Sequence, residues 1–217
     1  MTRSMLLTLG VLASSCGPTS PGGGTGTLFV TARLTSDGST SGSNARVTVR
    51  EGSSNGAVVK NAEVAIRGGA LGRTIIGYDD GREQYRLDKF TWVEGFRLEV
   101  IRGDDRLDGA IEAPGATLIV DPIAGSTYRR ADGPLLIRWR DGRNVVTGST
   151  QLRLEKAKIE LSIQQGVMDL LVDPNELVVN DKEQIRLERT NQVSLAGGVA
   201  GSTLSAGTEH SIEFRVE

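Results

Sequence analysis

The sequence nearly lacks the two residue types that most metal sites and many active sites require. Its 217 residues include one cysteine and one histidine. One cysteine excludes an intrachain disulfide framework and a zinc site built from several cysteines. One histidine, His210, removes most histidine-based catalysis and metal binding. We therefore expect no catalytic residues, no metal and no cofactor, and we expect that the chain is not an enzyme.

The sequence also lacks a surplus of either charge. It has 25 lysine and arginine residues against 27 aspartate and glutamate residues, a formal net charge of −2. Because nucleic-acid-binding proteins generally carry a basic surplus, we expect no nucleic-acid partner. Hydrophobic residues make up 38% of the chain, which is low but sufficient for packed cores at this length. The 28 glycines favour many turns.

No long apolar run is present near the N-terminus, but a short one precedes the single cysteine. Arg3 is the only charged residue among residues 1–16, and residues 5–13 read MLLTLGVLA. A helix that crosses a bilayer takes about 20 residues, so this run is too short to span one. It suffices for the apolar core of a secretory signal. Small residues then lead directly to Cys16.

Residues 12–16, Leu-Ala-Ser-Ser-Cys, resemble the lipobox of bacterial lipoprotein signal peptides, with alanine where that family most often has leucine. The resemblance implies that residues 1–15 are a signal peptide that is cleaved. It also implies that Cys16 receives a diacylglycerol on its sulfur and an acyl chain on its new amino group. The chain would then reach the membrane through the lipid at Cys16. The alternatives are an ordinary cysteine near the terminus and a secretory signal cleaved near Ser15.

A flexible tether follows the cysteine. Residues 17–26 read GPTSPGGGTG, in which glycine and serine give flexibility and two prolines prevent helix or sheet. With Cys16 these residues form a predicted lipid-anchored tether, residues 16–26. Glycine directly after the cysteine is similar to the outer-membrane sorting pattern of such lipoproteins. That similarity implies an outer-membrane location, in either the periplasmic or the surface-exposed leaflet.

Beyond residue 27 apolar residues alternate with polar ones, which is typical of half-buried β-strands. Asp-Gly, Asn-Gly and Gly-Gly pairs separate these stretches at the spacing of short strands and turns. Residues 151–163 are rich in helix formers, yet their apolar positions favour two strands or one strand with a bulge at 156–157. The sequence predicts an all-β fold of two tandem antiparallel β-sandwiches. The clearest alternating stretches are 28–34, 45–49, 62–66, 135–139, 185–187 and 212–216.

We place the boundary between the two sandwiches at residues 115 and 116, because two prolines bracket a short apolar run over residues 113–122. Within the first domain, residues 27–115, the stretch 45–112 resembles the transthyretin-like or carboxypeptidase-regulatory-like module. That resemblance implies a noncatalytic accessory domain. The positions that carry it are Ala62, Val64 and Ile66, then Asp80-Gly81 with Tyr85 and Leu87, then Gly95-Phe96 with Leu98 and Val100.

The second domain, residues 116–217, is similar to immunoglobulin-like or fibronectin-type modules. Trp139 falls on an early strand, and the chain ends on the strand SIEFRV. Because the chain has one cysteine, the disulfide-linked core of antibody domains is excluded.

Few residues remain as candidates for chemistry. His210 begins a strand pattern and has no Gly-x-Ser-x-Gly nucleophile to serve, so we interpret it as a partly exposed strand residue. Carboxylates cluster at residues 79–80 and 104–108, where turn formation explains them more simply than calcium binding. Trp92 and Phe90 share one face of an expected strand and form either a sugar-stacking platform or part of the core.

Together these features predict a noncatalytic cell-envelope lipoprotein that binds or scaffolds another envelope protein. A carbohydrate- or peptidoglycan-binding surface lipoprotein that uses Trp92 is the alternative. A hydrolase that uses carboxylates alone is a third possibility, because spacing by itself does not exclude an acid pair.

Overall fold

A computed structural model describes residues 25–37, 42–142 and 148–217, and this part of the chain is entirely β apart from three short 3₁₀ turns. The all-β prediction is therefore confirmed. Cys16 and most of the predicted tether lie outside the described residues. The three turns are η1 (Gly69–Leu71), η2 (Arg130–Asp132) and η3 (Pro174–Glu176).

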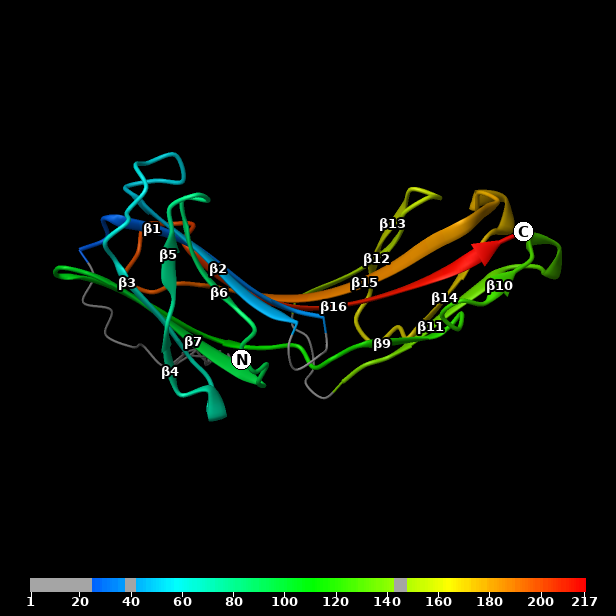
Figure 1. Cartoon of the computed structure of the whole chain (residues 1–217), viewed down its shortest axis with the longest axis horizontal. Coiled ribbons are helices and arrows are strands. Elements are labelled where there is room, and N and C mark those ends of the chain that lie inside the picture. Colours follow the sequence, from blue (N-terminus) through cyan, green and yellow to red (C-terminus); the bar gives the residue numbers. More distant parts are fainter. Residues whose placement is uncertain (1–24, 38–41, 143–147) are drawn as a thin grey trace, which may run out of the picture.

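One long sheet runs through the whole molecule, and two smaller sheets cover its lower face (Figure 1). The short β10 (Thr127–Tyr128) pairs in parallel with β16 (Thr203–Val216) of this sheet. The long sheet has the order β13 (Ile159–Ile163), β12 (Ser149–Leu154), β15 (Asn180–Ser194), β16 (Thr203–Val216), β1 (Leu28–Ser36), β2 (Ser43–Glu51), β6 (Gln84–Asp88) and β5 (Gly77–Asp79).

The two cover sheets define two lobes, each with its own hydrophobic core. In the N-terminal lobe the cover sheet has the order β4 (Arg73–Ile75), β3 (Glu63–Arg67), β7 (Gly95–Arg102) and β8 (Asp105–Glu112). In the C-terminal lobe it has the order β14 (Asp169–Val172), β11 (Leu135–Arg140) and β9 (Leu118–Asp121).

The residues that the alternation predicts to face inward are buried. In β1 the fully buried side chains are Leu28, Val30, Ala32 and Leu34, and the residues between them face outward. The same period of two holds in β2, β11 and β16. These strands are therefore half-buried, with one face on a core and the other in solvent.

The lobes are not built from separate stretches of chain. The chain passes from one lobe to the other at residues 113–117, next to the predicted boundary, but β15 and β16 extend through both lobes. In β15, Ile185 and Leu187 belong to the C-terminal core, whereas Val193 packs on the N-terminal core. At about 3.3 Å per residue, the 15 residues of β15 span about 50 Å.

The first strand completes this arrangement by pairing with the last. β1 and β16 run parallel, with Thr31 opposite Thr203 and Ser36 opposite Thr208. The long sheet is therefore mixed and not purely antiparallel. Parallel neighbours need a long connection. This pairing joins strands near the two ends of the described chain.

Residues 151–163 form a hairpin of two strands, β12 and β13, as one of the two predicted arrangements requires. Its turn is held by Glu183, whose fully buried carboxylate accepts hydrogen bonds from the backbone N–H groups of Lys156 (2.8 Å) and Ala157 (3.1 Å). Lys158 completes the turn with a φ of +55°. This tertiary contact, together with the apolar alternation, overrides the helix-forming composition of the segment.

Candidate functional site

The inward-facing residues of β15 and β16 change from apolar to polar halfway along each strand. In β15 the inward residues run from apolar Ile185 and Leu187 to polar Arg189 and Asn191, and then to apolar residues again. In β16 they run from Leu204 and Ala206 through Thr208 and His210 to Ile212 and Phe214. The polar positions lie where the two cores meet. We call Arg189, Asn191, Thr208 and His210, with Asp141, the polar waist.

Two of these side chains make three hydrogen bonds to the backbone where the lobes meet. Asn191 donates to the carbonyl of Glu112 (2.7 Å) and accepts from the N–H of Gly148 (3.1 Å). Thr208 donates to the carbonyl of Gly115 (3.2 Å). These side chains therefore satisfy backbone carbonyl and N–H groups at the junction of the lobes.

The fourth contact of the waist is a nearly buried ion pair. Arg189 Nη1 lies 2.8 Å from Asp141 Oδ1, with side-chain exposures of 7% and 19%. The two atoms make no well-aligned hydrogen bond, so the attraction is ionic. Burial raises the pKa of Asp141 although Arg189 opposes the change, and burial lowers the pKa of Arg189 although Asp141 opposes it. Each charge therefore depends on the other to remain in this place.

His210 lies in the middle of β16, not at its start. Its Nδ1 accepts a hydrogen bond from the N–H of Ile119 (3.1 Å), so the proton of the neutral ring is on Nε2. Burial lowers the pKa of His210 from its ordinary value of 6.5. The imidazole therefore serves as an acceptor for the first residues of β9.

We expect the stability of the protein to fall as the pH falls below about 6.5. The unfolded chain takes up a proton on His210 near its ordinary pKa, whereas the lowered pKa keeps the folded imidazole neutral. The loss stops once the pH is below the folded pKa. His210→Asn keeps an acceptor but cannot titrate, so its urea midpoint should change less between about pH 7.5 and pH 5. Identical pH profiles for the two proteins would contradict the assignment.

Trp92 is not on a strand, because β6 ends at Asp88 and β7 begins at Gly95. Lys89, with a φ of +59°, turns the chain out of the strand direction, so the strand expected to carry Phe90 and Trp92 does not form. The indole ring is partly buried, 5.1 Å from the ring of Phe96, and its N–H donates to the carbonyl of Pro114 (3.0 Å). Trp92 thus covers the edge of the N-terminal core, and a role in sugar binding stays a prediction.

The predicted carboxylate clusters have separate partners. Asp79 contacts Arg82 (4.0 Å), and Asp80 pairs with Lys60 (3.1 Å). Asp108 pairs with Arg97. Within residues 25–37, 42–142 and 148–217, no group of three or more histidine, cysteine, aspartate or glutamate side chains is arranged to hold a metal ion.

Asp105 has a different role, because it holds the beginning of the folded chain. Its carboxylate accepts hydrogen bonds from the hydroxyls of Thr25 and Thr27 and from the N–H of Thr25 (3.0 Å). These bonds lower the pKa of Asp105. The contact lies at the turn between β7 and β8, at the end of the N-terminal lobe that is remote from the waist, since Glu112 at the other end of β8 lies at the waist.

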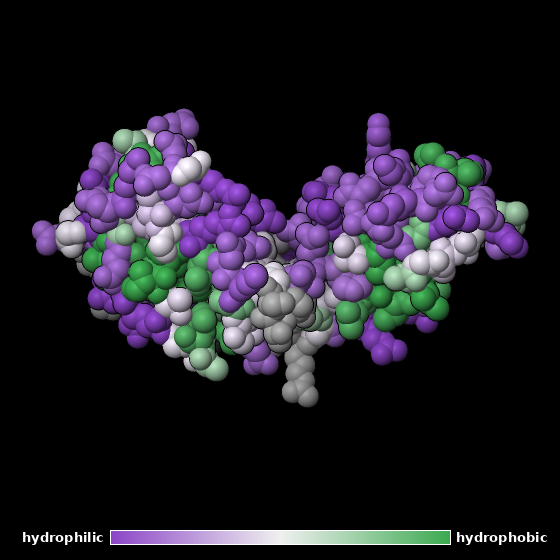
Figure 2. All heavy atoms as spheres, viewed as in Figure 1, coloured by the Kyte–Doolittle hydropathy of each residue, from purple (hydrophilic) through white to green (hydrophobic). Residues whose placement is uncertain are grey.

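The outer face of the long sheet is the candidate binding surface. Figure 2 shows that the molecule is hollowed between its lobes and that hydrophilic residues line the hollow. We call this concave surface the saddle. One part, of about 390 Å³, is lined by β1, β2, β15 and β16, and a second part, of about 500 Å³, extends over β12. Its charged side chains are Arg33, Arg46, Arg153, Arg186, Glu188 and Glu209.

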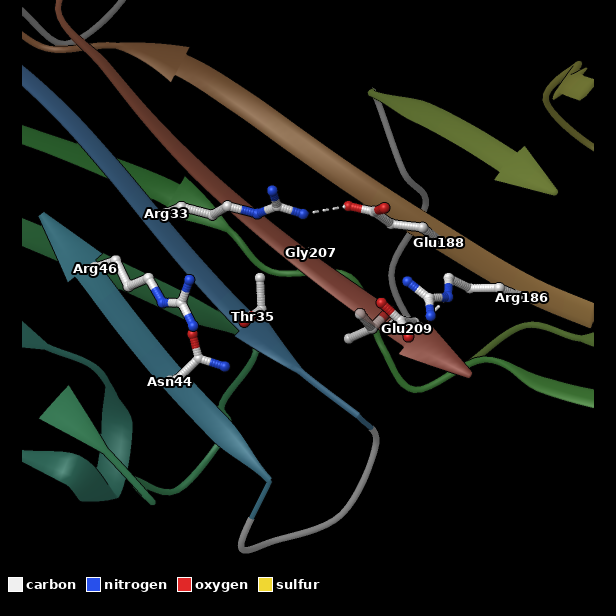
Figure 3. Close-up of a pocket in the computed structure, with 9 residues that line it drawn as sticks. Arg33, Thr35, Asn44, Arg46, Arg186, Glu188, Gly207 and Glu209 are labelled. Carbon is white, nitrogen blue, oxygen red and sulfur yellow. Dashed lines mark hydrogen bonds and ion pairs between the residues drawn. The ribbon is translucent and has the colours of Figure 1, made fainter. Parts of the chain in front are cut away.

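A glycine forms the floor of the saddle. Gly207 lies opposite Thr35 on β1 and Thr190 on β15. A Cβ atom at residue 207 would lie 2.9 Å from the hydroxyl of Thr190 and 3.1 Å from the carbonyl oxygen of Arg189. The residue therefore has to be small, and its missing side chain leaves the middle of the sheet open. Figure 3 shows the longer side chains of Arg33, Arg46 and Glu188 around this floor.

The sequence reasoning missed both the waist and the saddle. A signal for the waist was present, because Arg189 and Asn191 follow apolar Ile185 and Leu187 at the same inward parity of β15. The saddle depends on the pairing of β1 with β16, which local alternation does not indicate. Arg138 and Arg140, which stand close together in the sequence, lie on β11 in the C-terminal cover sheet.

Comparisons with known proteins give only distant structural similarity. No family model matches the chain, and no curated protein matches it. Among solved structures the chain is similar to a Ca²⁺-stabilised adhesin with which an Antarctic bacterium binds ice, with 10% identity and a TM-score of 0.27. The match covers 87% of this chain and 49% of the adhesin, so the chain spans about half the length of that neighbour.

No helix in the described parts of the chain has the length and apolar character that crossing a membrane requires.

Proposed function

We propose that this chain is a lipid-anchored, noncatalytic envelope protein that binds another envelope protein on its saddle. The saddle carries the proposal, because it is a concave surface between the lobes and the described residues that line it are polar or glycine. Concave surfaces that are polar throughout suit recognition of a polar partner and do not suit storage of an apolar ligand.

The anchor is the lipid at Cys16, which lies outside the described residues. The contact of Thr25 and Thr27 with Asp105 supports this part of the proposal, because it fixes where the tether leaves the fold. That point is the far end of the N-terminal lobe. A lipid at Cys16 would therefore hold this end near the membrane and leave the saddle and the C-terminal lobe free.

The noncatalytic part of the proposal rests on the contacts of the histidine and of the predicted carboxylate clusters. The single histidine accepts a backbone hydrogen bond, and the carboxylates of the predicted clusters pair with separate cations or hydroxyls. The transthyretin-like and immunoglobulin-like resemblances of the two halves are consistent with a binding module and remain predictions.

Site-specific photo-crosslinking in the native host tests the proposal. A photoreactive residue at Thr35, on the saddle, should give one discrete protein adduct, and one at Lys158, on the exposed β12–β13 turn, should not. The adduct should be identified by mass spectrometry as an envelope protein. Equal labelling from both positions, or no adduct from Thr35, would contradict a partner-binding saddle.

A further inference from the structure

One arginine of the saddle has no acidic partner. Arg33 pairs with Glu188 (2.8 Å), and Arg186 pairs with Glu209 (3.3 Å). These two pairs neutralise both glutamates that line the saddle. Arg46 lies beside them on β2, exposed to solvent, and forms no ion pair with any residue that the structure describes. Figure 3 shows its guanidinium at the rim, next to Asn44 and Thr35.

The position of Arg46 is unfavourable for the folded protein itself. In the register of the long sheet, Arg46 lies directly opposite Arg33 on one side and opposite Arg86 on the other. Like charges directly opposite each other destabilise a sheet. Arg33 and Arg86 have acidic partners, Glu188 and Asp88, whereas Arg46 does not. A residue in a position that is unfavourable for stability is typical of a functional site.

We propose that Arg46, with Thr35, Asn44 and the open floor at Gly207, is a subsite for a carboxylate of an extended polypeptide segment. This inference rests on the proposed function and names the chemistry of its partner. A guanidinium is a planar fork of N–H donors that matches the two oxygens of a carboxylate. Thr35 and Asn44 add neutral hydrogen-bonding groups beside it, and Gly207 leaves space for a chain to lie across the sheet.

The charges around Arg46 favour a polypeptide over the other polymers that carry acids. Glu188 and Glu209 in the same hollow are each paired with an arginine, so a ligand with uniform negative charge, such as nucleic acid or a polyuronate, finds a single unpaired cation there among the described residues. A polypeptide can place one acidic residue at Arg46 and neutral residues over the glutamates. In addition, no aromatic side chain lines the saddle in the described chain, so a sugar ring has no stacking surface there.

The probes are three short polymers titrated into the full chain and followed by NMR. The first is a capped octapeptide of alternating serine and glutamate, which in extended form presents its carboxylates on one side. The second has glutamine in place of glutamate, and the third is an oligogalacturonate of similar length. We expect the acidic peptide to bind and to shift the amide signals of Thr35, Asn44 and Gly207, and to bind more weakly as salt is added. The glutamine peptide should bind at least about tenfold more weakly.

Four variants locate the interaction. Arg46→Gln should weaken binding of the acidic peptide at least about tenfold, and Arg46→Lys should weaken it less, because a lysine keeps the charge but not the fork. Arg129→Gln removes the same charge from the far end of the C-terminal lobe and should bind as the parent does. Thr35→Trp fills the hollow without changing charge and should also abolish binding. Thermal melting should show Arg46→Gln to be at least as stable as the parent, because the opposed arginines are relieved.

The outcomes are separable from those of the proposed function. Loss of binding in Arg46→Gln and Thr35→Trp, but not in Arg129→Gln, supports the subsite. Equal weakening by Arg46→Gln and Arg129→Gln, or no saturable binding of the acidic peptide, overturns it. Equal or tighter binding of the oligogalacturonate overturns the choice of a polypeptide. If Thr35 crosslinks a partner whose capture does not depend on Arg46, the carboxylate subsite fails while the partner-binding saddle survives.

Discussion

Replacing Arg189 with methionine should lower the free energy of unfolding by about 3 kcal/mol, because it leaves the carboxylate of Asp141 largely buried without a cation. For a chain of this length that loss corresponds to a decrease in melting temperature of about 6–12 °C. Since Arg189 lies where the two cores meet, the loss should affect both lobes together. Thermal and urea unfolding, followed by circular dichroism, would measure it.

The double variant Arg189→Met/Asp141→Leu separates the ion pair from simple packing. With both charges removed, most of the lost stability should return, as happens when buried ion pairs are replaced by apolar residues. Arg215→Met is a matched control, because it breaks an exposed pair with Asp181 and should cost less than about 1 kcal/mol. A double variant as unstable as the single one would assign the effect to the lost packing of the arginine stem.

Replacing Cys16 with serine should move the protein from the membrane fraction to the soluble fraction of its native host. The hydroxyl of serine does not take the place of the thiol in lipid attachment, so the variant should lack the acyl chains. Several acyl chains bind a membrane far more tightly than one, so the redistribution should be nearly complete. Fractionation with detection of the protein would measure it, and intact mass would show the lost acyl chains.

Ser20→Ala is the control for this variant, because it alters the tether without touching the cysteine. It should remain with the membrane. A Cys16→Ser protein that stays membrane-bound, or a native protein that still begins at Met1 and has no added acyl mass, would end the lipoprotein hypothesis.

Alternation along the chain predicts which face of a strand is buried, but not which core buries it. In β15 a single parity runs from Ile185 to Val193, yet its two ends contribute to different cores. Each short apolar pattern therefore suggested a strand of one sandwich, and the shared strands were not foreseen. The hairpin of residues 151–163 was predictable, because its apolar spacing is local. Its support by Glu183 was not, because that contact joins positions about 26 residues apart.

The candidate site was less predictable than the fold. Polar outward residues look alike in every half-exposed strand, so nothing in Arg33 or Arg46 alone distinguishes a solvated face from a binding surface. What distinguishes them is the register that opposes Arg33 to Arg46 and the parallel pairing that brings Gly207 beside Thr35. Both depend on tertiary structure. By contrast, the sequence alone shows that Arg189 is a polar residue at the same parity as apolar Ile185 and Leu187.

The pairing of the first strand with the last also constrains how the molecule is made. Until residues 203–208 have emerged and docked, β1 presents an open hydrogen-bonding edge, and the N-terminal core lacks Leu204 and Ala206. The N-terminal half of the chain therefore remains incomplete during synthesis, and it needs protection from aggregation for that period. A gene cut between the lobes, at residues 113–117, would leave an N-terminal fragment whose core lacks Leu195, Leu204 and Ala206.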